Sequence, residues 1–165
     1  MSHPIALTPP LLQALDLSPA EAVLTPLLEA QGVEPSLRIR FEIDYPREPS
    51  DPRELSEIPE VRLWFIRLDS RYPWLPYYLD WEAGELARYT AMLVPHQFGP
   101  DGIRYNPEGL EIFVMQKVFV LSQWLRDGQG PARGGHRNLE GRSKLKLMLK
   151  TLGYELDDGL FELLA

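Results

Sequence analysis

The sequence predicts an α+β fold, in which a small antiparallel sheet of two to three strands packs with about four helices. Two observations support this class. Residues 37–45 alternate between apolar and polar side chains, as a half-buried strand does. Pro107–Arg126 is apolar on nearly every side, which is typical of a central, buried helix. At 165 residues the chain suits one core, so we expect a single domain over residues 1–165.

Three segments are predicted to form the sheet. Residues 37–45 make the clearest strand, with Leu37, Ile39, Phe41 and Ile43 on its apolar face. Residues 61–68 predict a second strand that is apolar on both faces and is therefore central or covered. Residues 5–7 predict a short edge strand. Residues 46–60 are too long for a tight hairpin, so a proline-rich loop is expected between the two main strands.

Helix signals account for the other elements. Ser18 and the proline after it predict a helix start, although Pro26 should kink or split that helix. Residues 81–93 predict a second helix, and residues 144–152 predict a short basic one. Residues 127–141 are rich in glycine and charge, and we expect them to form a flexible loop.

Composition excludes several classes of function. The chain has no cysteine, which excludes disulfides, thiolate nucleophiles and zinc or iron–sulfur sites built on thiolates. A net charge of −7 disfavours nucleic acid as the main partner. No stretch is apolar enough to span a bilayer, and residues 1–10 lack the pattern of a signal or transit peptide. We therefore expect a soluble cytoplasmic protein with no membrane insertion and no cofactor.

Histidine is the usual catalyst and metal ligand, and His96 is the one histidine placed just beyond a predicted helix. No histidine or glutamate stands at the spacing of a local metal site. The sequence therefore predicts no catalytic residue and no metal site. A structural or partner-contacting role for His96 is favoured, and a small hydrolase or transferase using His96 with a carboxylate is the alternative.

The loop between the two main predicted strands is the most individual part of the chain. Its prolines restrict the backbone, so a charged loop of this kind loses little entropy on docking. The simpler interpretation is a solvated connector, in which Arg47 and Arg53 pair with Glu48 or Glu57. We predict instead that the loop is the centre of a protein–protein contact. The residues expected to form it are Tyr45, Arg47, Glu48, Asp51, Arg53 and Glu54.

Residues 72–81 hold five aromatic side chains and two prolines. Such a run most often fills one end of a core, but Tyr and Trp also anchor protein interfaces. Stacking on nucleic acid would need basic residues between the rings, and only Arg71 is near. We therefore add Trp74, Tyr77 and His96 to the predicted partner-binding residues.

Several long strings in the chain resemble one protein family. They include Phe41-Glu42-Ile43-Asp44-Tyr45-Pro46-Arg47-Glu48-Pro49, Tyr72-Pro73-Trp74-Leu75-Pro76 and Met92-Leu93-Val94-Pro95-His96-Gln97-Phe98. With these strings, residues 37–125 and 152–156 resemble the chlororespiratory reduction six family.

The resemblance implies an assembly role and no enzymatic one. Members of that family, in cyanobacteria and chloroplasts, are maturation factors for the photosynthetic NAD(P)H dehydrogenase-like complex. The implied partner is a protein client, the ferredoxin-like hydrophilic subunit that carries iron–sulfur clusters. A chaperone-like factor would bind it in the cytosol or stroma before incorporation. The start of the sequence favours the cyanobacterial type. A permanent small subunit of a photosynthetic complex is the remaining alternative.

Overall fold

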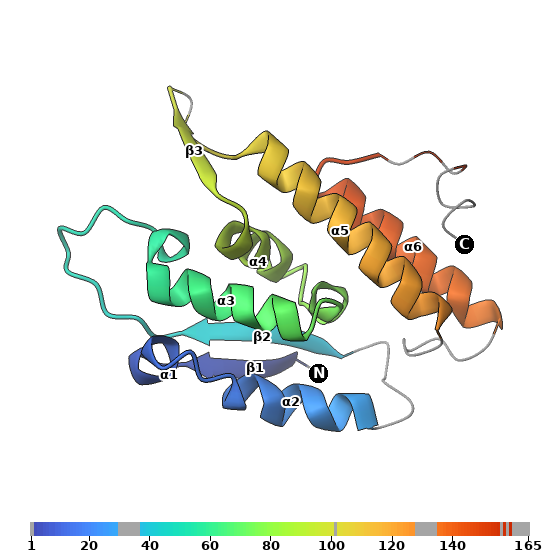
Figure 1. Ribbon diagram of the computed structural model, residues 1–165, viewed down its shortest axis with the longest axis horizontal. Helices are drawn as coiled ribbons and strands as arrows, with labels where there is room; N and C mark the ends of the chain where they lie inside the picture. The colour runs from blue at the N-terminus through green and yellow to red at the C-terminus, as the bar shows by residue number, and fades with distance from the viewer. Residues whose placement is uncertain are drawn as a thin grey trace. The chain divides into compact units, whose positions relative to one another are not determined.

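A computed structural model describes residues 2–29, 37–100, 102–127, 135–155, 157 and 159 (Figure 1). The chain forms two compact units, Met1–Asn106 and Pro107–Ala165, and each is described by itself. The class is α+β, as predicted. The described residues contain six α-helices, against about four expected, and two short 3-10 helices. The single-domain organisation of residues 1–165 stays a prediction.

The first unit is built on a parallel pair of strands, β1 (Ser2–Leu7) and β2 (Arg38–Ile43). The antiparallel arrangement that we predicted is wrong for this pair. The helices α1 (Pro9–Gln13) and α2 (Ser18–Glu29) carry the chain back to the same end of the sheet, as a parallel pair requires. Both predicted strand segments are confirmed, and α2 continues through its internal proline.

The second predicted main strand, residues 61–68, is wrong, because this segment forms the helix α3 (Pro59–Arg71). Proline occupies the first turn, where its missing N–H costs nothing, and glutamate follows it. The β-branched and aromatic side chains suggested a strand, but their burial follows the helical spacing i, i+3, i+4, i+7. The buried residues at that spacing are Val61, Trp64, Phe65 and Leu68.

A short aromatic segment and a third helix complete the unit. The 3-10 helix η1 (Leu55–Glu57) precedes α3, and η2 (Leu75–Tyr78) follows it. Leu79 then forms an isolated parallel bridge to Ile39 of β2. The helix α4 (Glu85–Leu93) begins four residues later than the expected residue 81, because residues 81–84 form a turn.

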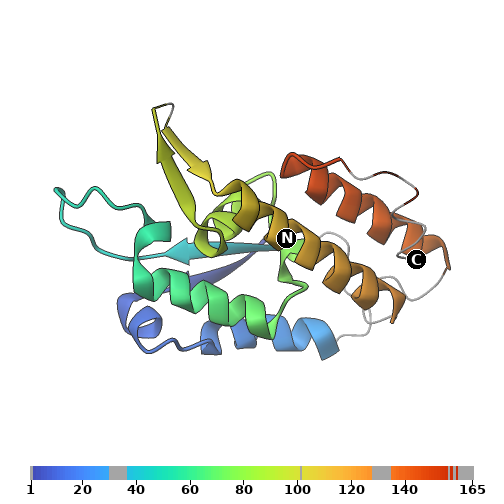
Figure 2. The same cartoon turned by 45° about the horizontal axis from the view of Figure 1, so that its top comes forward.

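An antiparallel hairpin, which the sequence did not lead us to expect, ends the first unit. Its strands are β3 (His96–Gly99) and β4 (Gly102–Tyr105), with His96 opposite Tyr105. Figure 2 shows the two strands side by side. The register pairs Gly99 with Gly102, and two glycines with a proline between them are turn signals, so the signal was present in the sequence.

One face of the parallel sheet forms the centre of the core. Residues paired across parallel strands point to the same face, and Ile5, Leu7, Ile39 and Phe41 are all buried there. The Phe41 ring lies 4.9 Å from the Phe65 ring and 6.3 Å from the Trp64 ring, between centroids. Figure 1 shows α2 beside β1 and α3 beside β2. The opposite sheet face, with Arg40 and Glu42, is exposed.

Two buried carboxylates, Glu85 and Asp69, join the sheet and helices of this core. The backbone N–H of Phe41 donates to Glu85 Oε2 at 3.2 Å, and Arg88 donates to Glu85 Oε1 at 3.1 Å. Burial raises the pKa of Glu85, and the Phe41 hydrogen bond opposes that rise. The Tyr89 hydroxyl donates to Asp69 Oδ1 at 2.5 Å, and burial raises the pKa of Tyr89 well above its ordinary value. Together they tie β2, α3 and α4.

The second unit is built on α5 (Pro107–Arg126), whose bounds agree with the prediction. Ile112 and Phe119 are 64% and 54% exposed, so the expectation that α5 is buried on every side is wrong. Lys117 is fully buried, and its Nζ lies 5.3 Å from the centroid of the Phe113 ring.

The second helix of this unit, α6 (Gly135–Thr151), is longer than the expected residues 144–152. Residues 135–141, which we expected in a flexible loop, form its first turns, and residues 128–134 lie outside the described residues. The helices approach closely at Gly141, where a Cβ would lie 2.7 Å from Leu125 Cδ2.

Candidate functional site

The proline-rich loop, residues 44–58, connects a strand to a helix and not two strands as expected. Its first residue is fixed to the sheet, because Asp44 N–H donates to Leu7 O of β1 at 2.9 Å. Its last residues form η1 and lead into α3. Both ends therefore belong to the rigid core of the first unit.

Hydrogen bonds within the loop hold its middle. The Arg53 guanidinium forms a bidentate pair with the Asp51 carboxylate, through Nε at 2.9 Å and NH2 at 2.7 Å. Arg47 donates to the backbone oxygen of Arg53. The Glu54 N–H donates to Glu57 Oε2 at 2.8 Å. The Arg53 hydrogen bond lowers the pKa of Asp51 to about 2, so this pair stays charged over the physiological range.

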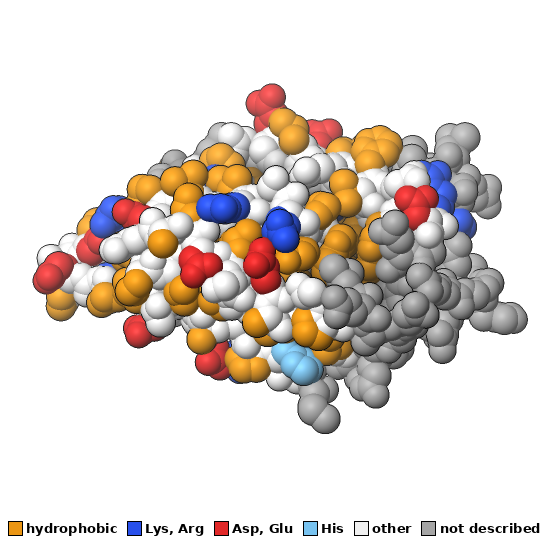
Figure 3. Space-filling view, turned by 60° about the horizontal axis from the view of Figure 1, so that its bottom comes forward, with side chains coloured by type: hydrophobic (Ala, Val, Ile, Leu, Met, Phe, Trp, Pro, Cys, Tyr) orange, Lys and Arg blue, Asp and Glu red, His pale blue; other side chains and the backbone are white. Residues whose placement is uncertain are grey.

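These bonds match the simpler interpretation in part, although the partners differ. Arg53 does pair internally, with Asp51 in place of Glu48 or Glu57. Arg47 is used to hold the backbone of the loop. Arg47, Glu48 and Glu54 are nevertheless exposed, and Tyr45 is partly so. Figure 3 shows acidic and basic side chains close together at its left end, where this loop lies.

The aromatic run lies in the interior. Trp74 is 9% exposed and Tyr77 is 7% exposed, and each ring meets the Tyr78 ring edge-on at 5.6 and 5.5 Å between centroids. Burial raises the pKa of Tyr78. Trp74 and Tyr77 are therefore buried among other aromatic rings, whereas most of the predicted loop residues are exposed.

His96 begins β3, half-buried, with its ring 5.4 Å from the Tyr105 ring between centroids. The hydrolase alternative requires a carboxylate or nucleophile about 3 Å from the imidazole. Within the described part of the chain, His96 has no hydrogen bond or ion pair to such a group. The nine predicted residues thus form an exposed loop group, a buried aromatic pair and a separate histidine.

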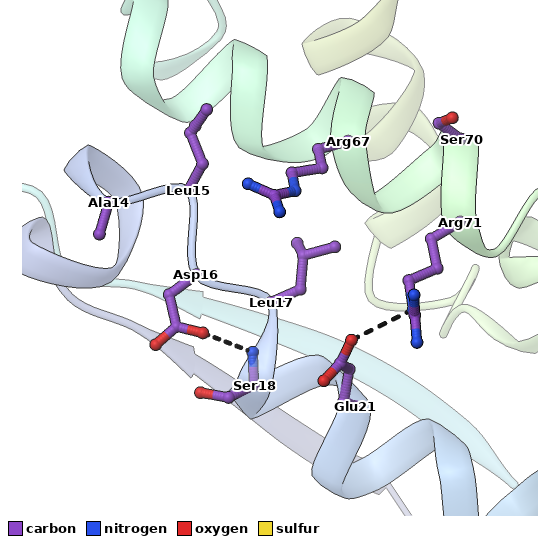
Figure 4. Close-up of a pocket in the computed structure, with 9 residues that line it drawn as sticks. All are labelled: Ala14, Leu15, Asp16, Leu17, Ser18, Glu21, Arg67, Ser70 and Arg71. Carbon is purple, nitrogen blue, oxygen red and sulfur yellow. Dashed lines mark hydrogen bonds and ion pairs between the residues drawn. The ribbon is translucent and has the colours of Figure 1, made fainter.

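A pocket that the sequence did not reveal lies between the turn after α1, the start of α2 and α3, with a volume of about 690 Å³ (Figure 4). Arg71 pairs with Glu21 across it at 3.1 Å, and Asp16 Oδ1 accepts from Ser18 N–H at 2.9 Å. The missed signal was the helical period of residues 59–71, which would have placed Arg67 and Arg71 on the pocket side.

Two classes of site are not represented in the described ranges. No group of three or more His, Asp and Glu side chains among residues 2–29, 37–100, 102–127 and 135–155 could hold a metal ion. Over the same ranges, no helix has the length and apolarity needed to cross a membrane.

A family model described as chlororespiratory reduction 6 matches residues 7–163, almost the whole chain. The chain belongs to the chlororespiratory reduction 6 family. Membership implies a role in the assembly of the NAD(P)H dehydrogenase-like complex, together with a protein partner. No solved structure matches this member of the family.

Proposed function

We propose that this chlororespiratory reduction 6 protein is a chaperone-like maturation factor. Its client is the ferredoxin-like, iron–sulfur-carrying hydrophilic subunit of the NAD(P)H dehydrogenase-like complex. It binds that subunit in the cytosol, as the cyanobacterial type, before the subunit joins the membrane complex. Family membership supports the role in assembly of the complex, and the loop of residues 44–58 supports the proposed mode of binding.

The observation that carries the mode of binding is the preformed shape of the loop. Both of its ends are fixed to the core, and Arg47 and Arg53 bond within it. A loop that is already ordered loses less conformational entropy on docking than a free one. It therefore suits a factor that must bind and later release its client without chemistry.

The charge of the loop indicates the kind of surface that it meets. Residues 44–58 carry five acidic and two basic side chains. Arg53 and Asp51 neutralise each other, which leaves the exposed Glu48 and Glu54 to face a partner. We infer a basic or polar surface on the client, since opposite charges orient the encounter and speed it.

The test measures binding of the full chain to the recombinant client subunit by calorimetry. Glu48→Lys reverses an exposed charge without removing any bond that holds the loop. We expect it to weaken binding about threefold to tenfold, and to change unfolding free energy by less than about 0.5 kcal/mol. The matched control is Glu42→Lys on the exposed face of β2, which should bind normally.

A second pair of variants separates the contact role from the structural one. Arg53→Glu breaks the pair with Asp51 and should loosen the loop. The exchange Asp51→Arg with Arg53→Asp restores an ion pair within the loop, so client binding should recover in part. If Glu48→Lys binds as well as the wild type, the loop is not the contact.

The other assignments predict different behaviour. A permanent subunit would co-purify with the finished complex, whereas a maturation factor should co-purify with the free client only. If the protein were a hydrolase that uses His96, His96→Ala would abolish its hydrolase activity. A maturation factor that binds through the loop should still bind its client in this variant.

A further inference from the structure

The outer face of α3 is a second surface with the character of a binding site. Leu63, Ile66, Arg67 and Ser70 lie at positions i, i+3, i+4 and i+7, so they share one side of the helix. All four are exposed. Leu63 and Ile66 are 51% and 43% exposed, which leaves two large apolar side chains next to each other in water.

This face borders the pocket between the turn after α1, the start of α2 and α3, because Arg67 and Ser70 also line that pocket. Figure 4 shows the Arg67 side chain reaching from α3 over Leu15 and Leu17. The neighbouring charges already have partners, because Arg71 pairs with Glu21 and Asp16 caps α2. Among the residues that the structure describes, Arg67 has no ion-pair partner. A ligand entering the pocket would therefore meet one unpaired cation beside apolar side chains.

The pocket wall also holds an unusual backbone conformation. Leu15 has φ of +51°, in the left-handed region that glycine adopts most easily. Two hydrogen bonds close the turn after α1, from Leu15 N–H to Leu12 O at 3.1 Å and from Asp16 N–H to Leu11 O at 2.9 Å. The turn places the leucine side chain in the pocket, where it adds to the apolar surface.

We propose that the outer face of α3 and this pocket bind a segment of a partner protein that carries leucine-like side chains and a carboxylate. The apolar side chains would cover Leu63 and Ile66, and the carboxylate would pair with Arg67. A phosphate-rich partner fits less well, because Asp16 and Glu21 line the same pocket and repel a phosphate group more strongly than the single charge of a carboxylate. This surface is separate from the loop and does not depend on the proposed client.

The test uses the full chain, labelled with 15N, and a short capped peptide of leucine and glutamate at helical spacing. Saturable shifts are expected at the amides of residues 14–18 and 63–71. The same peptide with lysine in place of glutamate should cause none. Arg67→Glu should weaken binding about fivefold, and Ile66→Asp about tenfold. The matched control, Leu147→Asp at an exposed leucine of α6, should bind like the wild type.

Three results would overturn the proposal. One is equal binding of the lysine peptide, and another is wild-type affinity in a folded Ile66→Asp variant. The third is self-association of the wild type that Ile66→Asp abolishes, since a second copy would then cover this face. Glu48→Lys in the loop should bind the peptide normally, so failure of the client proposal and failure of this one are distinguishable.

Discussion

Replacement of Phe41 by alanine tests the central feature of the first unit. The side chain is 1% exposed and its ring meets the rings of Phe65, Trp64 and Tyr89 at 4.9, 6.3 and 6.5 Å between centroids. Truncation of a buried phenylalanine costs about 3–5 kcal/mol, and three lost aromatic contacts place this site toward the upper end. Since total stability is about 5–15 kcal/mol, much of it would be lost.

The assay is urea denaturation followed by far-ultraviolet circular dichroism, with hydrogen exchange of the peptides covering β2 and α3. Phe41→Leu keeps most of the volume and should cost no more than about 1.5 kcal/mol. Glu42→Ala, on the exposed face of the same strand, should stay within about 0.5 kcal/mol of the wild type. A loss in Phe41→Ala no larger than in Glu42→Ala would refute the packing of this face against α3 and α4.

Four further predictions follow from buried or strained positions. Because burial raises the pKa of Glu85 above its unfolded value, its contribution to stability is full at low pH and falls as pH rises through the raised pKa. As pH rises from about 4 to about 7, the unfolding free energy of Glu85→Gln, measured by denaturation, should therefore increase relative to that of the wild type. A decrease over the same range would contradict the direction of the pKa shift. Tyr89→Phe leaves Asp69 without its hydroxyl donor and should cost about 1–3 kcal/mol in a thermal melt, so an unchanged midpoint would count against that bond. Phe113→Ala, at a residue 6% exposed in α5, should cost about 3–5 kcal/mol, and a neutral result would show that the second unit does not depend on this ring. Gly153→Ala places a Cβ in open space at φ of +87°, so it should lower the unfolding free energy by about 1–2 kcal/mol through backbone strain alone. A variant more stable than the wild type would show that there is no such strain.

The elements that could be predicted are those whose local sequence pattern is clear over their whole length. α5 was placed correctly because its apolar run begins at Pro107, a residue that suits the first turn of a helix, and continues to Arg126. β2 was found because its alternation is regular over six residues and one face is buried. In both cases local preference and tertiary packing agree, so the sequence alone was sufficient.

The failures have physical reasons as well. Residues 61–68 are rich in side chains that prefer strands, and only packing against β2 made the helical period decisive. The orientation of β1 and β2 depends on the crossover, whose helix start at Ser18 was recognised but not used. Exposure of the loop was anticipated from its prolines, whereas the pairing of Arg53 with Asp51 depends on a turn geometry that spacing does not give. The pocket was missed because it needs α3 to be a helix.

The bonds that shape the loop are all short in sequence. The pair of Asp51 and Arg53 spans two positions, the bond from Arg47 to the Arg53 carbonyl spans six, and that from Glu54 to Glu57 spans three. The core holds the two ends of the loop, through the bond from Asp44 N–H to Leu7 O and through the buried side chains of Ser56 and Ile58. A head-to-tail cyclised peptide of residues 44–58 should therefore keep much of the loop conformation outside the protein. Such a macrocycle should compete with the full protein for the client. The same segment could also be grafted onto another protein whose backbone ends lie at the same separation.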